Sequence, residues 1–417
     1  MPASSSHRVA PCAAALEWLQ EGPRKRVSLG LATMRRLTKS LGLRLGGDCA
    51  PVCIHVAGTN GKGSVCAMAA SICHAGGFRT GLFTSPPLVR WSEHVRVDGR
   101  MIGEAETVSG LEAIRSLVGG WEPQPTSFEI TTALALAHFA SSRCQVMVIE
   151  AGLGGRLDAT NIVTPAVSVL TPIDLDHQQH LGSSLAQIAA EKAGIIKPGV
   201  PVVSARQPDE AAAVIRRIAF ERRAPLHEVG EPVEHLAIGL AGNYQRWNAA
   251  LAIRALEHSG LDVPPDAIQR GLASVTWPGR FQRIGERIVL DGAHNPAAAR
   301  CLAQTWREVF GETKATLVLG VLQDKNLRGI CETLLPIASR IIAVIVQNPR
   351  SSSARELCDV IRDIAPEFAI TEATSLPGAI GSARAQSDPI LVAGSLFLVG
   401  ETLAFLHDEG AREVSVP

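Results

Sequence analysis

Short apolar runs alternate with segments of helical period along most of the chain. The runs form two groups, first PVCIHVAG, CQVMVIEAG, AVSVLTPID and PVVSA, then RIVLDGA, ATLVLGVL, RIIAVIV and PILVAGS. Apolar strands separated by helices are typical of parallel sheets that are covered by helices on both faces. The pattern therefore predicts an α/β fold with two mostly parallel sheets.

The stretch between the two groups, SVTWPGRFQRIGER at residues 274–287, is rich in Pro, Gly and Arg and has no helical period. A chain of 417 residues exceeds the roughly 250–300 residues that one apolar core supports. We therefore place a domain junction in this stretch and predict domains at residues 1–280 and 281–417.

The composition narrows the class of protein. Hydrophobic residues make up 46% of the chain and charged residues 19%, and no apolar run is long enough to span a bilayer, which argues against disorder and membrane insertion. Forty basic residues balance forty acidic ones, so no charge excess favours a nucleic acid or an anionic membrane. A small-molecule partner is the better expectation.

The cysteines and the first residues bear on the compartment. The nine cysteines are scattered without a C-x-x-C pair and mostly lie among apolar residues, as core thiols of a reducing compartment do. The start, MPASSSHRVAPCAAALEWLQ, lacks a basic region followed by a sustained apolar stretch and does not resemble a signal peptide. We expect a cytoplasmic protein.

The segment GTNGKGS at residues 58–64 lies between a predicted strand and a predicted helix. Its glycines permit positive φ and close backbone approach, so amides can point at phosphate oxygens near the helix N-terminus. It misses the pattern G-x-x-x-x-G-K-[ST], because Val56 replaces the first glycine and Gly63 the hydroxyl residue. Lys62 is suited to phosphates and Ser64 to magnesium. The alternative is a glycine-rich turn with an exposed lysine.

In open α/β sheets, ligands bind beyond the carboxyl ends of the strands. Glu150 ends an otherwise apolar run, where a carboxylate needs a partner such as a hard cation; capping the AGLGG turn or pairing with Arg156 are the alternatives. His177 follows the next run and is a candidate ligand of the same ion. Its competitors for that role are Asp174, Asp176 and His180.

Lys192 lies in SSLAQIAAEKAGIIKPG, which has serines suited to an N-cap and a glycine suited to end the helix. The lysine is either a charge that complements the helix dipole and extends outward, or a partly buried neutral amine open to modification or phosphate contact. Spacing alone leaves both readings open.

In the second group, IVLDGAHNPAAARCLA reads as strand, turn and helix, with Asn295 as N-cap and Pro296 at the first helical position. Asp291 is placed to bind ribose hydroxyls, and His294 to face an inter-domain cleft. Arg280, in the junction, is placed to reach a phosphate across that cleft; a solvated arginine is the alternative.

Together, these motifs resemble the folylpolyglutamate synthase and dihydrofolate synthase group of the Mur ligase superfamily. The resemblance covers nearly the whole chain, in the order GTNGKGS, TSPPLVRWSEHVRVDG, SFEITTALAL, EAGLGGRLDATN, DLDHQQHLGSSLAQIAAEKAGIIKPGVP, GNYQRWNAALA, WPGRFQ, DGAHNPAA, VLGVLQDKN and AGSLFLVGE. It implies an amino-terminal P-loop domain of the Mur ligase central type and a smaller Rossmann-like domain that receives glutamate, with ATP between them.

The resemblance also implies roles for individual residues. Lys62, Lys192 and His177 are expected to be catalytic, with Lys192 carried as a carbamate. Magnesium is expected at Ser64, Ser85, Glu150 and His177, and potassium is a further candidate ion. The expected ATP contacts are Gly58, Thr59, Asn60, Gly61, Lys62, Gly63, Ser64, Asn248, Arg280 and Asp291. The expected substrate contacts are Ser127, Phe128, Glu129, Arg156, Leu157, Asp158 and His294.

Two positions depart from the pattern that many bacterial members of the group share. Pro87 follows Pro86 where those members have T-S-P-H, and His94 follows Glu93 where E-R is usual. We expect Pro87 to affect the shape of the folate loop and not the use of ATP. His94 removes an arginine and leaves the contacts to the second substrate open.

The expected activity is an ATP-dependent ligase that adds L-glutamate to dihydropteroate, to reduced folates, or to both. A carboxylate is a poor acyl donor, so ATP must first convert it to an acyl phosphate. The alternatives are a Mur ligase for a UDP-muramoyl substrate and a nucleotide-binding switch with little catalysis. We expect a monomer without nucleic-acid or membrane partners; the sequence does not choose between the pterin acceptors.

Overall fold

The structure is a computed structural model, which describes residues 11–21, 24, 30–46 and 50–407. The segment MPASSSHRVA, on which part of the signal-peptide prediction depends, lies outside the described residues, as do the outer ends of the two predicted domains, residues 1 and 417.

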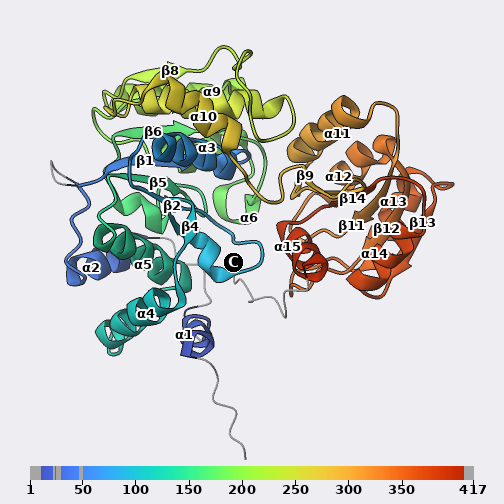
Figure 1. Ribbon diagram of the computed structural model, residues 1–417, viewed down its shortest axis with the longest axis horizontal. Helices are drawn as coiled ribbons and strands as arrows, with labels where there is room; N and C mark the ends of the chain where they lie inside the picture. The colour runs from blue at the N-terminus through green and yellow to red at the C-terminus, as the bar shows by residue number, and fades with distance from the viewer. Residues whose placement is uncertain (1–10, 22–23, 25–29, 47–49, 408–417) are drawn as a thin grey trace, which may run out of the picture.

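The larger sheet has eight strands among the described residues (Figure 1). Their order is β4 (Arg100–Met101), β3 (Val95–Val97), β2 (Thr80–Phe83), β5 (Val146–Glu150), β1 (Val52–Ala57), β6 (Val167–Leu170), β7 (Val202–Ser204) and β8 (Leu226–Glu228). The six neighbouring strands β2, β5, β1, β6, β7 and β8 pair in parallel, and β3 and β4 add an antiparallel edge.

The smaller sheet has six strands in the described part of the chain. Their order is β13 (Ile370–Ala373), β12 (Ala338–Val344), β11 (Ala315–Leu319), β14 (Ile390–Ala393), β10 (Ile288–Leu290) and β9 (Gln282–Ile284). All neighbours pair in parallel except β9, which forms an antiparallel edge on β10. The prediction of an α/β fold with two mostly parallel sheets is confirmed.

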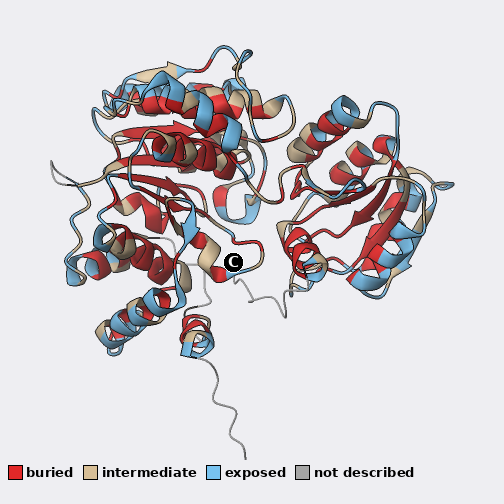
Figure 2. Ribbon diagram, viewed as in Figure 1, coloured by how far each residue is buried: buried red, intermediate tan, exposed pale blue. Residues whose placement is uncertain are grey.

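Helices cover the faces of both sheets, as the buried strands and the half-buried helices of Figure 2 show. With the first sheet go α1 (Pro11–Leu19), α2 (Ala32–Ser40), α3 (Lys62–Ala75), α4 (Glu104–Val118), α5 (Ser127–Ser141), α6 (Gln178–Leu181), α7 (Leu185–Ala193), α8 (Asp209–Glu221), α9 (Tyr244–Glu257), α10 (Pro265–Ser274) and the 3₁₀ turns η2 (Trp91–His94) and η3 (Ala159–Ile162). With the second sheet go α11 (Pro296–Phe310), α12 (Leu327–Leu334), η4 (Leu335–Ile337), α13 (Ala354–Ile364), α14 (Leu376–Arg384) and α15 (Leu396–Leu406).

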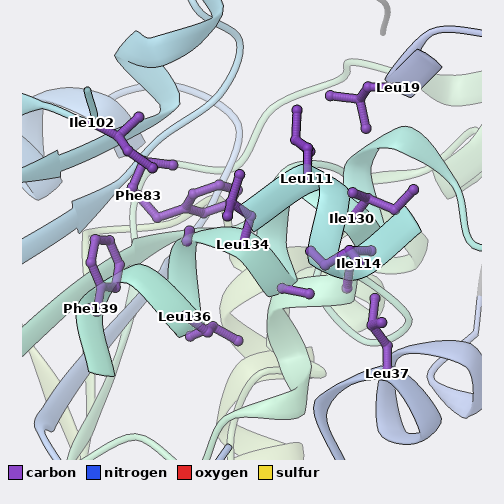
Figure 3. Packing of buried hydrophobic residues seen from close by; sticks show 14 of the residues in the cluster. Leu19, Leu37, Phe83, Ile102, Leu111, Ile114, Ile130, Leu134, Leu136 and Phe139 are labelled. Atoms are coloured by element: carbon purple, nitrogen blue, oxygen red, sulfur yellow. The ribbon is translucent and has the colours of Figure 1, made fainter. Parts of the chain in front are cut away.

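The two faces of β1 belong to different apolar cores. Ile54 and Val56 pack against α3 and α9, whereas Cys53 joins the core that α1, α2, α4 and α5 build on the opposite face. Figure 3 shows this second core, to which Phe83, Ile130 and Phe139 belong. A central parallel strand buried on both faces reads as a continuous apolar run, which explains why such strands are evident in the sequence.

All eight apolar runs are strands, and the strands missed by the sequence pattern are mostly short edge strands. β4 and β8 have two and three residues and carry polar or exposed positions. β13 is largely exposed. Such strands bury too little surface to leave an apolar signature.

Helix ends follow the predicted caps. Ser184 caps α7 through the Gln187 amide in a capping box, and Gly194 follows the helix. Asn295 caps α11 through the Ala298 amide, with Pro296 at the first position. These predictions are confirmed. Six cysteines are buried thiols, as predicted: Cys53, Cys66, Cys73, Cys144, Cys331 and Cys358. No described helix combines the length and apolar character needed to cross a membrane.

Candidate active site

A cavity of ≈ 550 Å³ lies where residues that follow strands of both sheets meet. β1, β5 and β6 lead into it from the larger sheet and β10 from the smaller one, and α6 and α15 lie on the facing sides in Figure 1. Every predicted site residue lines it except Arg156. The rule that ligands bind beyond the carboxyl ends of parallel strands thus points to the edge of each sheet at which the cavity lies.

The loop after β1 has the backbone that phosphate binding needs. Gly61 is the N-cap of α3 with φ 88°, and Gly58 also has positive φ. A Cβ on Gly61 would lie 2.7 Å from Oδ1 of Asn248, so both the positive φ and this close contact exclude a side chain there. The first turn of α3 carries no acidic residue, which leaves its positive end open to an anion.

Gly63 is glycine for a different reason than the sequence suggested. It lies inside α3 without positive φ, and a Cβ there would lie 2.8 Å from Nε1 of Trp277. Trp277 belongs to the junction segment. The Trp277 indole, which packs on the helix backbone, therefore fills the space that the hydroxyl side chain of a Walker loop would take at position 63.

Glu150 is buried at the end of β5 beside the phosphate loop. Its Oε1 lies 4.0 Å from Nζ of Lys62, and its Oε2 accepts a hydrogen bond of 3.3 Å from the Ser85 amide. Burial raises the pKa of the Glu150 carboxyl, and the Lys62 charge opposes that rise. Pairing with Arg156, the alternative considered above, is wrong: Arg156 binds Glu191 at 2.8 Å.

Lys192 is buried, with 4% of its surface exposed, and donates from Nζ to the Gly58 carbonyl at 2.8 Å. Burial and then the charge of Lys62 lower the pKa of its amine to about 7. The reading as an outward-extending lysine is wrong. The amine of Lys192 is instead held under the phosphate loop in a partly neutral state.

His177 is the N-cap of α6 and has positive φ. Burial and then the charge of Lys325 lower the pKa of its imidazole to about 3, so the ring is neutral and able to act as a ligand. Thr59, on the phosphate loop, donates to the Asp174 carbonyl at 3.0 Å. This bond connects the loop after β1 with the loop after β6.

Asp176 joins the two domains. Its Oδ1 lies 2.6 Å from Nζ of Lys325, and both side chains are 6% exposed. Nε2 of His294 lies 3.5 Å from Oδ2, and Asn295 donates to the same oxygen at 3.3 Å. Burial alone would raise the pKa of Asp176, but the hydrogen bond and charge of His294, with the charges of His177 and Lys325, bring it well below its usual value.

The residues predicted to contact the nucleotide come from both domains. Asn248 is buried on α9 and donates to Gln245 at 2.9 Å. Asp291 accepts from the Phe281 and Ala293 amides at 2.8 Å each, and Arg280 lowers the carboxylate pKa that burial raises. Asp291 therefore shapes the turn after β10 as well as lining the cavity.

The predicted substrate residues have unequal surroundings. Phe128 lies against Gly152, so closely that a Cβ there would be 2.4 Å from the Phe128 ring, and Leu157 lines the cavity. Glu129 caps α5 by accepting from the Thr126 amide at 2.8 Å. Arg156 does not line the cavity, because its guanidinium turns to Glu191 on α7.

His94, at the position where the resemblance led us to expect an arginine, is buried and lines the cavity. Its Nδ1 must donate to the Thr84 carbonyl at 2.7 Å, since a carbonyl only accepts. Burial lowers the pKa of the ring to about 4. His94 is therefore a neutral ring stacked on Phe83, and its Nε2 is a hydrogen-bond acceptor, where an arginine would be a charged donor.

The predicted metal residues fit a magnesium ion better than a protein-only metal cage. Within the described ranges no group of three or more His, Cys, Asp or Glu side chains could hold a metal. Glu150 and His177, with the hydroxyls of Ser64 and Ser85, line the cavity beside the phosphate loop. Magnesium is usually held by one or two carboxylates together with substrate phosphates and water, which suits this donor set.

Sequence reasoning missed three features of the site. Lys325, in the quoted VLGVLQDKN, was given no role although it follows a buried strand, β11, as the ligand rule requires. Trp277 packs on the phosphate loop, and nothing in its spacing indicated this contact. The residues 395–397 line the cavity from the start of α15.

Comparisons with known proteins agree with this architecture. The Mur ligase middle domain matches residues 56–208, and the Mur ligase glutamate ligase domain matches residues 279–396. Fold and site thus define a Mur-type ligase, with a phosphate-loop domain and a glutamate ligase domain.

Relatives specify the family. The dihydrofolate synthase/folylpolyglutamate synthase of Bacillus subtilis is 33% identical, covering 93% of this chain and 97% of its own. "E.coli FolC in complex with DHPP and ADP" superposes with a TM-score of 0.85 at 32% identity, covering 97% and 99%. A Yersinia pestis enzyme "complexed with AMPPNP and Mn ion" has a TM-score of 0.86 at 33% identity, covering 96% and 98%. The chain belongs to the dihydrofolate synthase/folylpolyglutamate synthase family of ATP-dependent ligases.

Proposed function

We propose that this protein uses ATP to join L-glutamate to the carboxylate of a pteroyl compound, either dihydropteroate, a reduced folate, or both. The observation that supports this most directly is the lining of the cavity between the two sheets. It brings the phosphate loop, the buried Glu150 and Lys192, and His294 of the second domain to one space. The named relatives and the ADP- and DHPP-bound neighbour support the same substrates.

The reaction has two steps. An oxygen of the acceptor carboxylate attacks the γ-phosphorus of ATP, which releases ADP and leaves an acyl phosphate. The glutamate α-amine then attacks the acyl carbon, inorganic phosphate leaves, and the amine loses a proton to form the amide. Both steps depend on positioning and on neutralising phosphate charge, which suits a site between two domains.

Different residues of this chain bind the phosphates, the rest of the nucleotide and the magnesium ion. Lys62 and the amides of α3 receive the phosphates, while Asn248, Arg280 and Asp291 hold the nucleotide. Magnesium, held by Ser64, Ser85, Glu150 and His177, would neutralise charge on the transferred phosphoryl group when bound. A neutral His177 suits that ligand role.

Lys192 is proposed to carry a carbamate. Its lowered pKa supplies the neutral amine that attacks carbon dioxide and then loses a proton to solvent. The charge of Lys62, the largest charge effect on this pKa, favours an anion there, against the opposing charges of Asp176 and Asp158. The carbamate would replace a cation near the phosphates by an anion that helps to bind magnesium. A potassium ion remains a prediction, tested by activity with potassium against sodium salts.

The predicted acceptor side comprises Ser127, Phe128, Glu129, Leu157 and Asp158, with Arg156 acting from outside the cavity through Glu191. His294 is proposed to meet the glutamate substrate from the second domain, because it lines the cavity beyond β10.

The domain boundary is proposed at residues 280 and 281. A cytoplasmic monomer is proposed as well; large exposed apolar side chains of the described residues are scattered over separate elements, as Phe220 on α8 and Phe405 on α15 illustrate.

The test is ADP release by purified protein with ATP, magnesium and glutamate, comparing dihydropteroate with tetrahydrofolate. We expect ADP release that requires glutamate and at least one of the two acceptors. If neither acceptor gave ADP release above background, the proposal would be contradicted. Turnover of a UDP-muramoyl substrate in preference to both pterins would establish the Mur-type alternative, and ATP binding without turnover would establish a switch.

A further inference from the structure

His55 is a fully buried histidine that the proposed reaction does not use. It lies in the middle of β1, three residues before the phosphate loop, and none of its surface is exposed. On the neighbouring strands it pairs with Ile149 and Ser168. Burial, and then the charge of Lys197, lower the pKa of its imidazole to about 3, so the ring is neutral.

The hydrogen bonds define the tautomer of His55. The Thr160 hydroxyl lies 2.5 Å from Oδ1 of Asp158, a carboxylate oxygen that only accepts, so the single hydroxyl proton goes to Asp158. Nε2 of His55 lies 2.9 Å from the same Thr160 oxygen. Because that oxygen has no second proton to give, Nε2 must donate, and the proton of His55 is on Nε2.

Nδ1 of His55 is then a buried acceptor, and it has no hydrogen-bond partner among the described residues. An unsatisfied buried polar atom costs stability. An apolar side chain in this position would avoid that cost, so the histidine is not explained by packing of the core. What the histidine provides, and an apolar side chain could not, is the hydrogen bond that Nε2 donates to Thr160.

Asp158 organises the loop that forms the acceptor side of the cavity. Oδ1 also accepts from the Thr160 amide at 3.0 Å, and Oδ2 accepts from the Leu153 amide at 2.8 Å. These bonds hold both ends of the segment from Gly152 to Asp158 against η3. Several of its residues line the cavity: Gly152, Leu153, Gly154, Leu157 and Asp158.

The same loop is packed against the helix that carries Lys192. The Arg156 amide donates to the Glu191 carbonyl at 2.7 Å, and a Cβ on Gly155 would lie 2.7 Å from the Lys192 carbonyl. Lys192 in turn donates to Gly58, at the end of the strand that carries His55. A closed path of contacts therefore connects β1, η3, the loop and α7.

We propose that His55 is a positioning residue, which holds the acceptor loop of residues 152–158 in its binding shape through Thr160 and Asp158. The inference rests on the proposed function in that it identifies this loop with the acceptor side. His55 touches no substrate. Loss of its donor lets the Thr160 hydroxyl turn away from Asp158, and the loop then samples other shapes, which weakens acceptor binding and leaves the phosphate loop in place.

The test compares His55→Leu, which removes the donor, with His55→Gln, whose amide nitrogen can replace Nε2–H. We expect His55→Leu to raise the KM for the pteroyl acceptor about tenfold, with the KM for ATP and kcat changed less than about twofold. His55→Gln should stay within about threefold of the wild type. Melting temperatures should not fall in either variant, since His55→Leu removes an unsatisfied buried atom.

Thr160→Val provides the matching change on the other side of the bond. It should raise the same KM, and His55→Leu/Thr160→Val should be no worse than the more affected single variant. Equal kinetics of His55→Leu and wild type would overturn the inference, as would equal rises in the KM for ATP and acceptor or unfolding of both His55 variants. An inactive wild type would instead refute the proposed function, and acceptor binding measured by titration would then test His55.

Discussion

Single residues in this protein have properties that their sequence positions conceal. Lys192 was as compatible with a solvated helix end as with a modified amine, and only burial under Gly58 decides between these readings. Gly61 is required by its backbone, whereas Gly63 is required by Trp277. Every predicted site residue except Arg156 lines the cavity, and Arg156 shows the limit of such predictions: a motif gives the loop and not the direction of a side chain.

The carbamate proposal predicts that Lys192→Ala loses about a hundredfold in ligation rate, because an anion that helps to organise magnesium is removed. Added acetate or formate should restore part of the rate. Lys192→Arg, which keeps a cation but cannot form the carbamate, should be as impaired as the alanine variant without rescue. Steady-state ADP release measures all three, and full activity in the unrescued alanine variant would refute the carbamate.

While its amine is free, as in buffers without carbon dioxide, the lowered pKa of Lys192 also makes stability depend on pH. Between its folded pKa of about 7 and the usual 10.5, the unfolded chain binds a proton that the folded protein does not. The free energy of unfolding should therefore rise with pH across this window, by up to about 1.4 kcal/mol per pH unit. Urea titrations from pH 7 to 10 should show a smaller slope for Lys192→Met and an unchanged slope for the exposed control Lys314→Met; equal slopes in all three would contradict the pKa.

At the scale of elements, central strands and capped helices are the parts that the sequence specifies best. Parallel strands buried on both faces produce apolar runs, and Ser184, Gly194 and Asn295 mark helix ends by local hydrogen bonding. Edge strands such as β8 and β13 lack that signal. The packing of the junction on α3 could not be predicted either, because a contact between distant segments leaves no local periodicity.

That packing predicts the effect of making the phosphate loop more like a Walker loop. Gly63→Ser places a side chain where the Trp277 indole lies, so α3 or the junction must shift. We expect the KM for ATP to rise about tenfold, and Gly63→Ser/Trp277→Leu to recover part of the loss. Gly120→Ser, at a glycine with no atom within 4 Å of an added Cβ, is the control. Unchanged ATP use by Gly63→Ser would show that the indole does not restrict this position.

For the whole molecule, the cavity requires the two sheets to face each other, and buried polar contacts help to fix that arrangement. Asp176 and Lys325 connect the domains with little exposure, while Asp174 and Arg300 connect them at the surface at 3.4 Å. The sequence predicted two domains and the edges that meet. It could not identify which charges pair across the interface, because that depends on three-dimensional placement.

Lys325→Met should destabilise the protein by about 3 kcal/mol or more, since it leaves the buried Asp176 without its nearest cation. Asp176→Asn/Lys325→Met should lose clearly less than the sum of the single variants. The exposed pair gives a matched control: Arg300→Met should change the free energy of unfolding by less than about 1 kcal/mol. Additive losses in the Asp176 and Lys325 series, measured by urea unfolding, would rule out the coupling.

The central claim is that this protein phosphorylates a pteroyl carboxylate before glutamate attacks it. The most direct measurement uses an acceptor whose reacting carboxylate carries ¹⁸O at both oxygens, with ATP, magnesium and glutamate, and determines the isotope content of the released phosphate by mass spectrometry. An acyl phosphate transfers one labelled oxygen to each phosphate as the amide forms. We predict one ¹⁸O per phosphate, in step with amide product; unlabelled phosphate, or ADP formed without amide, would contradict the account.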